Sequence, residues 1–165
     1  MTQTAYSLDE LDTNLIRLLQ REPRIGMLEA SRRLGVARGT VTARMDRMRA
    51  AGVITGFGPD LDLRAIGYTV MAFSILELAQ GRIRDVTTDL SVIPEVLEAH
   101  TIAGRGDLLI RIVARTNDHL MDVIESILRS PHVARAETMI ALTDQIPFRP
   151  LSALDGPGLN PRDAP

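Results

Sequence analysis

The apolar residues of this chain change their spacing once, and that change divides the chain into two differently built parts. Up to Gly52, apolar side chains recur every three or four positions, as they do on one face of a helix. From Gly67 onward, apolar and β-branched runs of strand length alternate with two helical patterns. The chain has 165 residues, 45% of them hydrophobic, which suits one ordinary domain or two very small ones. We therefore expect an α+β fold in which a helical part precedes a mixed part.

Three helices are predicted in the helical part, over residues 8–21, 28–34 and 38–51. Ser7 and Glu10 have the spacing of a capping box at the start of the first helix. Gly35 and Gly52 end the second and third helices, because glycine accepts the left-handed backbone that follows a helix. A short helix, a glycine turn and a third helix with polar outer positions predict a helix-turn-helix. Two short extended runs over residues 53–61 then predict a small β-wing or linker, as in winged variants.

The second part is predicted to follow the order βαββαβ. Strands are expected over residues 68–78, 96–103, 108–114 and 133–142, and helices over residues 82–90 and 118–128. A faint repeat supports two related halves, since Pro94-Glu95-Val96 recurs as Pro131-His132-Val133, thirty-seven residues later. Two such halves form a ferredoxin-like sheet with both helices on one face. The other face has no cover within the chain, although residues 70–76 are apolar on both sides, so we expect at least a homodimer.

Charge is unevenly distributed along the chain. The net charge is -2, and the basic side chains are nineteen arginines with no lysine. From Arg24 to Arg49, however, seven arginines face only Glu29 and Asp46, which gives a net charge of +5 over twenty-six residues. Such a cluster is often only a solvated helical face. Here it coincides with the predicted helix-turn-helix, which favours contacts with the phosphates of DNA.

Composition excludes several classes of protein. Without Cys the chain has no disulfide and no cysteine metal site, and without Lys it has no Schiff-base or P-loop lysine. Aromatic residues make up 3%, too few for stacking platforms that bind single-stranded nucleic acid. The longest apolar run, residues 70–76, is far shorter than the roughly 18 residues that span a bilayer, and no signal peptide is evident. We expect a cytoplasmic protein with no cofactor, no metal site and no membrane partner.

Several motifs in a fixed order resemble the Lrp/AsnC (feast/famine) family of transcription regulators. They are Leu8-Asp9-Glu10-Leu11-Asp12, Leu18-Leu19-Gln20-Arg21-Glu22-Pro23-Arg24-Ile25, Leu34-Gly35-Val36, Arg44-Met45-Asp46-Arg47-Met48, Gly52-Val53-Ile54-Thr55-Gly56-Phe57 and Ala103-Gly104-Arg105-Gly106-Asp107-Leu108-Leu109-Ile110. The resemblance implies a nucleoid-associated regulator that binds double-stranded DNA and assembles as dimers and often octamers. It also implies that the second part, a RAM/ACT-like domain, binds an amino acid or related metabolite between subunits.

These observations divide the chain into four segments. We predict a winged helix-turn-helix DNA-binding domain over residues 1–54, a β-linker over 55–66, a ligand-binding and oligomerisation domain over 67–146, and a flexible tail over 147–165. The tail holds five of the nine prolines and has no periodicity, which predicts disorder.

The DNA-contacting candidates lie on the last two helices of the helix-turn-helix. The first turns of the recognition helix enter the major groove, where Arg pairs with guanine and Thr offers a hydroxyl and a methyl group. We predict base or groove contacts from Arg38, Thr40, Thr42 and Arg44, and phosphate contacts from Arg47, Arg49, Arg32 and Arg33. Arg44 could instead form a salt bridge with Glu29 or with Asp46 of a neighbouring chain. Ala37 stands where the family usually has a Ser N-cap, so this helix is expected to lack that cap.

The effector candidates centre on the glycine loop. The backbone N–H groups of Gly104, Arg105 and Gly106 could hold a carboxylate, and Asp107 could accept from an amino group. The alternative is a tight turn in which Asp107 bonds only the backbone. Gly106 replaces an aromatic residue common in the family, which predicts a more flexible loop. The resemblance adds Thr138 and Met139 on the last strand and Asp118 and Asp122 on the last helix.

Three other functions compete with this prediction. An effector-independent DNA-organising protein would fit the altered glycine loop. An enzyme resembling the siroheme decarboxylases would need a cluster of His and Arg, whereas His100, His119 and His132 have no catalytic spacing. A ligand-binding scaffold without DNA binding would require the Arg-rich helix to be only a solvated face. The intact helix-turn-helix spacing favours a regulator that is not an enzyme.

Overall fold

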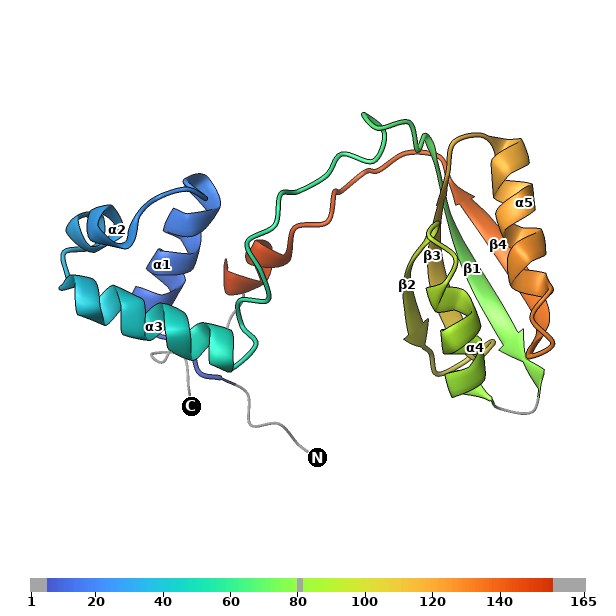
Figure 1. The fold of residues 1–165 in the computed structure, drawn as a ribbon, viewed down its shortest axis with the longest axis horizontal. Coiled ribbons are helices and arrows are strands. Elements are labelled where there is room, and N and C mark those ends of the chain that lie inside the picture. The colour runs from blue at the N-terminus through green and yellow to red at the C-terminus, as the bar shows by residue number, and fades with distance from the viewer. Residues whose placement is uncertain (1–5, 80–81, 156–165) are drawn as a thin grey trace. The chain divides into compact units, whose positions relative to one another are not determined.

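The chain forms two compact units, seen in a computed structural model that describes residues 6–79 and 82–155. The first unit contains the described residues up to Pro59 together with those from Pro147, and the second runs from Asp60 to Ile146. Figure 1 shows a helical first unit and a sheet with helices in the second. The predicted linker over residues 55–66 straddles this boundary. Its exact limits, and those of the predicted domains, stay predictions.

Helices build the first unit as predicted. They are α1 (Glu10–Arg21), α2 (Met27–Leu34) and α3 (Arg38–Ala50). Gly35 takes the left-handed conformation after α2, with a φ of 67°. The predicted capping box is wrong by two residues. Asp9, in an extended conformation, accepts from the backbone N–H of Asp12 at 2.9 Å, and the Asp12 carboxylate accepts from the backbone of Asp9. Because a carboxylate caps a helix as well as a hydroxyl does, the Ser7 signal was not decisive.

The core of the first unit comes from all three helices. Its fully or nearly fully buried members are Leu8, Leu15, Ala30, Val41 and Met48. Val41 and Met48 lie on α3 together with the buried Met45, and this confirms the apolar stripe predicted for that helix. The stripe fixes which side of α3 faces α1 and α2, and so which side faces solvent. Ala37 precedes α3 without a side-chain cap, as expected.

Part of the predicted flexible tail forms a helix. Residues 150–155 form a 3-10 helix, η2 (Pro150–Asp155). Leu154 packs against the core of the first unit, and Asp155 accepts from Arg17 of α1 at 2.5 Å. The composition of the tail suggested disorder, yet Leu154 contacts the core of the first unit and the Asp155 carboxylate contacts α1. Residues 156–165 lie outside the described part of the chain.

Residues 53–61, predicted to form a small β-wing or a linker, form no strand, and none occurs between Val53 and Thr69. Val53 and Ile54 instead direct their backbone N–H groups to the carbonyl of Met48 and close the end of α3. An extended run becomes a strand only when another strand pairs with it, and Pro59 has no N–H to donate. Sequence reasoning identified the extended run but could not supply its partner.

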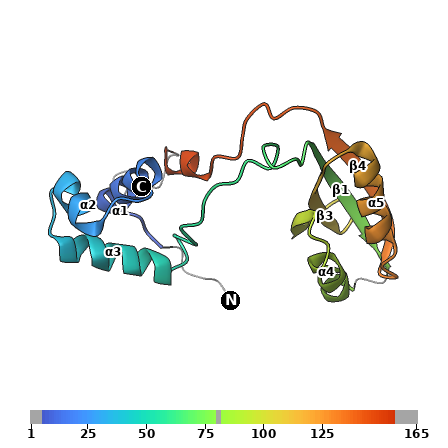
Figure 2. The same ribbon diagram turned by 45° about the horizontal axis from the view of Figure 1, so that its top comes forward.

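The second unit confirms the predicted βαββαβ order. Its elements are β1 (Val70–Leu78), α4 (Ile83–Ser91), β2 (Val96–Thr101), β3 (Leu108–Ala114), α5 (Asn117–Leu128) and β4 (Val133–Ala141). The strands form one antiparallel sheet in the order β2-β3-β1-β4, the ferredoxin-like arrangement. Helices α4 and α5 cover one face of it, as Figure 2 also shows.

The two faces of the sheet differ in their cover. Ala72, Ser74 and Leu76 of β1 are buried beneath the helices, whereas Met71 and Phe73, which alternate with them, are only half buried. Within the described part of the second unit, no helix covers the face that holds Met71 and Phe73. We call it the open face. The sequence predicted an apolar face of this kind, because residues 70–76 are apolar on both sides of the strand.

Candidate DNA interface and effector surface

Burial of one side of α3 turns the other side to solvent. With Val41, Met45 and Met48 inside, the exposed residues of α3 are Arg38, Gly39, Thr40, Thr42, Ala43, Asp46, Arg47, Arg49 and Ala50. Five of the predicted DNA-contacting side chains are therefore accessible on α3: Arg38, Thr40, Thr42, Arg47 and Arg49. The Thr42 hydroxyl donates to the carbonyl of Arg38 at 3.1 Å, so its hydrogen is already used within the helix.

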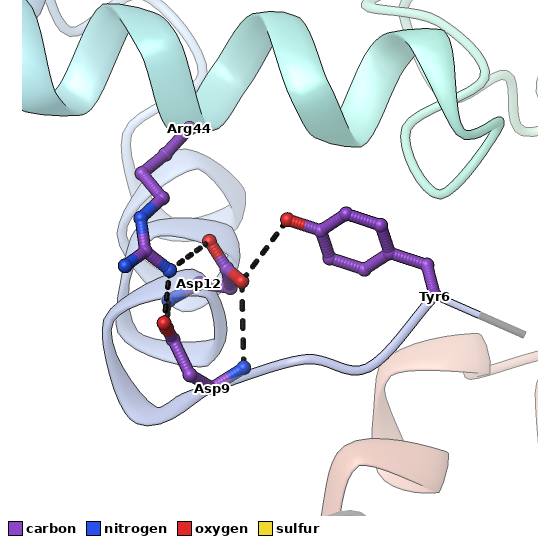
Figure 3. A network of polar contacts seen from close by, with 4 residues as sticks. All are labelled: Tyr6, Asp9, Asp12 and Arg44. Carbon is purple, nitrogen blue, oxygen red and sulfur yellow. Dashed lines mark hydrogen bonds and ion pairs between the residues drawn. The ribbon is translucent and has the colours of Figure 1, made fainter.

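Arg44 does not take the predicted groove-facing position. Its guanidinium bonds the carboxylate of Asp9 and lies 3.1 Å from Oδ1 of Asp12. The Arg44 side chain is 23% exposed and that of Asp12 only 1%. Figure 3 shows the network, which Tyr6 completes by donating its hydroxyl to Asp12 at 3.2 Å. Arg44 therefore ties α3 to the start of α1. Glu29, considered from the sequence as a partner of Arg44, is not its partner, and a pairing with Asp46 of a neighbouring chain stays a prediction.

Asp9 and Arg44 stabilise each other's charged forms. Burial alone would raise the pKa of Asp9, but hydrogen bonds from Arg44 and from the Asp12 backbone, with the Arg44 charge, hold that pKa below its ordinary value. Hydrogen bonds to Asp9 and Asp12 raise the pKa of Arg44. Burial, followed by the neighbouring Asp12 carboxylate, raises the pKa of the Tyr6 hydroxyl. Two carboxylates at i and i+3 of a helix start were the sequence signal for such a partner.

The arginines of α2 have carboxylate neighbours. Arg33 bonds both Glu29 and Glu22, and Arg32 lies 3.6 Å from Glu29. These ion pairs are exposed to solvent and therefore weak. Both guanidinium groups remain accessible, but each is partly neutralised by a carboxylate neighbour.

Three arginines of α3 have fewer partners than Arg44 does. The guanidinium of Arg49 lies 6.0 Å from the ring centre of Phe57. Across residues 6–79 and 82–155, no ion pair involves Arg38, Arg47 or Arg49. Among the predicted DNA-contacting arginines, those without an ion pair in the described residues are therefore all on α3.

The glycine loop is tied to the sheet. The Asp107 carboxylate accepts from the backbone N–H of Leu78 at 2.7 Å, and the Asp107 N–H donates to the carbonyl of Leu76 at 2.9 Å. Arg105 lies 3.0 Å from Glu137 of β4. One carboxylate oxygen of Asp107 therefore accepts from the backbone, which was the predicted alternative to binding an effector.

Gly106 has a backbone conformation and surroundings that suit glycine, and the predicted flexibility of the loop stays a prediction. Its φ is 83°, a conformation that side chains disfavour. A Cβ there would lie 2.3 Å from Cγ2 of Ile75 and 3.2 Å from the carbonyl oxygen of Leu76. The backbone packs where no side chain fits, so glycine is required at this position.

The remaining effector candidates do not gather in one chain. Thr138 lies 3.0 Å from the buried Ser74 hydroxyl, on the helix-covered side of the sheet. Met139, the next residue, is 49% exposed and belongs to the open face. Asp118 and Asp122 are exposed on α5, which packs on the Thr138 side. Of these four residues, only Met139 shares the open face with Glu137, the partner of the loop.

Comparisons with known proteins match both units. The family model described as winged helix-turn-helix DNA-binding matches residues 8–55, and the one described as Lrp/AsnC ligand binding domain matches residues 71–150. An uncharacterised helix-turn-helix transcriptional regulator of Pyrococcus abyssi is 31% identical over 145 residues, covering 85% of this chain and 92% of that protein. The curated relatives are named as transcriptional regulators, not as enzymes.

Solved structures agree with the fold. That of AsnC from Escherichia coli superposes with a TM-score of 0.78 at 28% identity and covers 88% of this chain and 99% of that one. A Neisseria meningitidis regulator solved with L-methionine gives 0.77 at 20% identity, covering 89% and 99%. None of the helices described here is both long and apolar enough to cross a membrane.

Proposed function

This chain belongs to the Lrp/AsnC family of transcriptional regulators, and from that premise we propose that it reads specific DNA sequences with the exposed side of α3. The observation that carries the proposal is the set of solvent-facing arginines on α3 that form no ion pair with the described residues. The first turns of such a helix enter the major groove. Arg38 and Thr40 then approach base edges, while Arg47 and Arg49 reach phosphates.

We assign a smaller contribution to DNA binding to Arg32, Arg33 and Arg44. Arg32 and Arg33 share their charge with Glu29, so each contributes less to phosphate binding than an arginine of α3. Arg44 acts indirectly, because it fixes the orientation of α3 on α1. The DNA-contacting surface is therefore narrower than the arginine count of this region suggests.

The test is a salt titration of DNA binding by fluorescence anisotropy. Each lost phosphate contact should reduce the slope of log K against log salt by about 0.9. We expect that reduction for Arg47→Ala and for Arg49→Ala. The control is Arg84→Ala on α4, an exposed arginine of the other unit, which should leave the slope unchanged. Equal slopes for all three variants would contradict the proposed interface.

We also propose that the open face is covered by a second copy of the chain. Phe73 and Met139 would be removed from water by that contact, with a two-fold axis placing two α3 helices on DNA half-sites. Further association to an octamer is proposed on the family resemblance.

An amino acid or related small metabolite is the effector that we propose. The glycine loop and Met139 of one subunit would bind it together with Asp118 and Asp122 of a neighbouring subunit, because one chain does not bring these residues together. The two exposed carboxylates suit an α-ammonium group, and loop N–H groups suit a carboxylate. The L-methionine complex of the Neisseria regulator supports this class of ligand.

A DNA-organising protein without an effector is the second candidate. The observation in its favour is that Asp107 already accepts from the Leu78 backbone. Thermal unfolding with each of the twenty amino acids separates the candidates, since a ligand at 100 times its Kd adds about 2.7 kcal/mol of stability. A shift with one or a few amino acids supports the regulated protein. A flat response across the panel supports the second candidate.

A further inference from the structure

Asp46 is the one acidic residue of α3, and it lies on the exposed side. In the part of the chain that the structure describes, neither an ion pair nor a side-chain hydrogen bond engages its carboxylate. An unpaired negative charge on a surface that binds phosphates reduces non-specific affinity. The Asp46 carboxylate is therefore available to accept a hydrogen bond from a group outside the described residues.

Helix geometry places Asp46 close to the middle of the exposed side. At 3.6 residues per turn, it lies about 140° around α3 from the buried Val41. Gly39, Ala43 and Ala50 lie within about 40° of the direction opposite Val41, and all three are exposed. The space around Gly39 is open, with no atom within 4 Å of where a Cβ would be. Small neighbours on this side let the helix lie deep along the groove, so that Asp46, in the third turn, reaches base edges beyond those contacted by the first turns.

We propose that Asp46 determines sequence specificity by accepting a hydrogen bond from the N4 amino group of a cytosine in the major groove. The inference rests on the DNA binding proposed above. A carboxylate can only accept hydrogen bonds, which excludes guanine O6 and N7 and thymine O4 as partners. Adenine offers an amino group, but its N7 acceptor lies beside it and repels a second acceptor. Cytosine is the base whose major-groove edge is a donor alone.

The experiment is selection from a random duplex pool with full-length wild type, Asp46→Asn and Asp46→Ala. Wild type should enrich a C·G pair at one position of each half-site. Asp46→Ala should lose that preference, because no acceptor remains. Asp46→Asn should exchange it for A·T, since an amide pairs bidentately with adenine. On the wild-type site Asp46→Ala should bind about tenfold more weakly, although it binds unrelated duplex more tightly.

Two results would overturn the inference, and they differ. If all three proteins enrich the same sequence and the variants merely bind every duplex more tightly, Asp46 is only a repulsive charge. If wild type enriches nothing and binds no duplex, the proposed function itself fails. Glu125→Gln, at an exposed acid of α5, is the matched control and should select the wild-type sequence. Circular dichroism of each variant should match wild type, since Asp46 has no partner to lose.

Discussion

At the scale of single residues, the contacts of Arg44 separate structure from recognition on the same helix. The carboxylate of Asp12 is buried and accepts hydrogen bonds from Arg44, Tyr6 and the Asp9 backbone. Arg47, one turn nearer the end of α3, is exposed. Two arginines three residues apart therefore have different roles, because one faces α1 and the other faces solvent. Residue type alone could not distinguish them.

We expect Arg44→Ala to destabilise the first unit by about 2 kcal/mol, because it leaves the buried Asp12 carboxylate without its cation. Urea unfolding followed by circular dichroism measures this loss. Arg47→Ala is the matched control and should change stability by less than about 0.5 kcal/mol. A similar midpoint for both variants would mean that the network does not stabilise the unit.

The lowered pKa of Asp9 makes the network sensitive to acid. A carboxyl group whose pKa is lower in the folded state than its ordinary value of 3.8 stabilises the fold while it is ionised. This stability is present above the unfolded pKa and is lost as pH falls through the folded pKa. Below about pH 4, wild type should therefore lose stability more steeply than Asp9→Asn. Urea midpoints measured from pH 7 down to pH 2.5 test this, and parallel curves would refute it.

At the scale of elements, hydrophobic period predicted helices and strands well because burial decides both. The predicted strand over residues 108–114 and helix over 28–34 differ from β3 and α2 by no more than one residue at either end. The hydrophobic period did not predict the structure where contacts with distant parts of the chain decide it. Residues 53–61 have no strand partner within residues 6–79 and 82–155, and η2 depends on Leu154 meeting a surface formed by distant helices. Long-range partners leave no local pattern.

The η2 helix should stabilise the first unit through Leu154. This side chain is half buried against the core, so Leu154→Ala should cost about 1 kcal/mol. Phe148→Ala is the control, because Phe148 is 87% exposed and has little contact to lose. Thermal unfolding of the full-length variants compares the two. Equal stability of Leu154→Ala and Phe148→Ala would show that η2 does not pack on α1 in solution.

At the scale of the whole molecule, the candidate effector residues show what one chain cannot provide. Thr138 and Met139 are neighbours in sequence but lie on opposite faces of the sheet, while Asp118 and Asp122 lie on the helix-covered side. Sequence reasoning grouped them by family resemblance, and the fold of one subunit separates them. A site that includes residues from both sides needs a second subunit. Assembly is therefore the property on which the proposed regulation depends.

The open face offers a direct test of assembly. Phe73 lies at its centre on β1, between Arg111 of β3 and Met139 of β4. Phe73→Asp should convert a dimer to a monomer, because the interface would bury a charge without a partner. Sedimentation equilibrium measures the mass, and Thr87→Asp on the exposed side of α4 is the control. A monomer presents one α3 helix where a dimer presents two, so the affinity of Phe73→Asp for a two-half-site duplex should fall about 100-fold or more. A dimeric Phe73→Asp, or a monomer with undiminished affinity, would contradict assembly through this face.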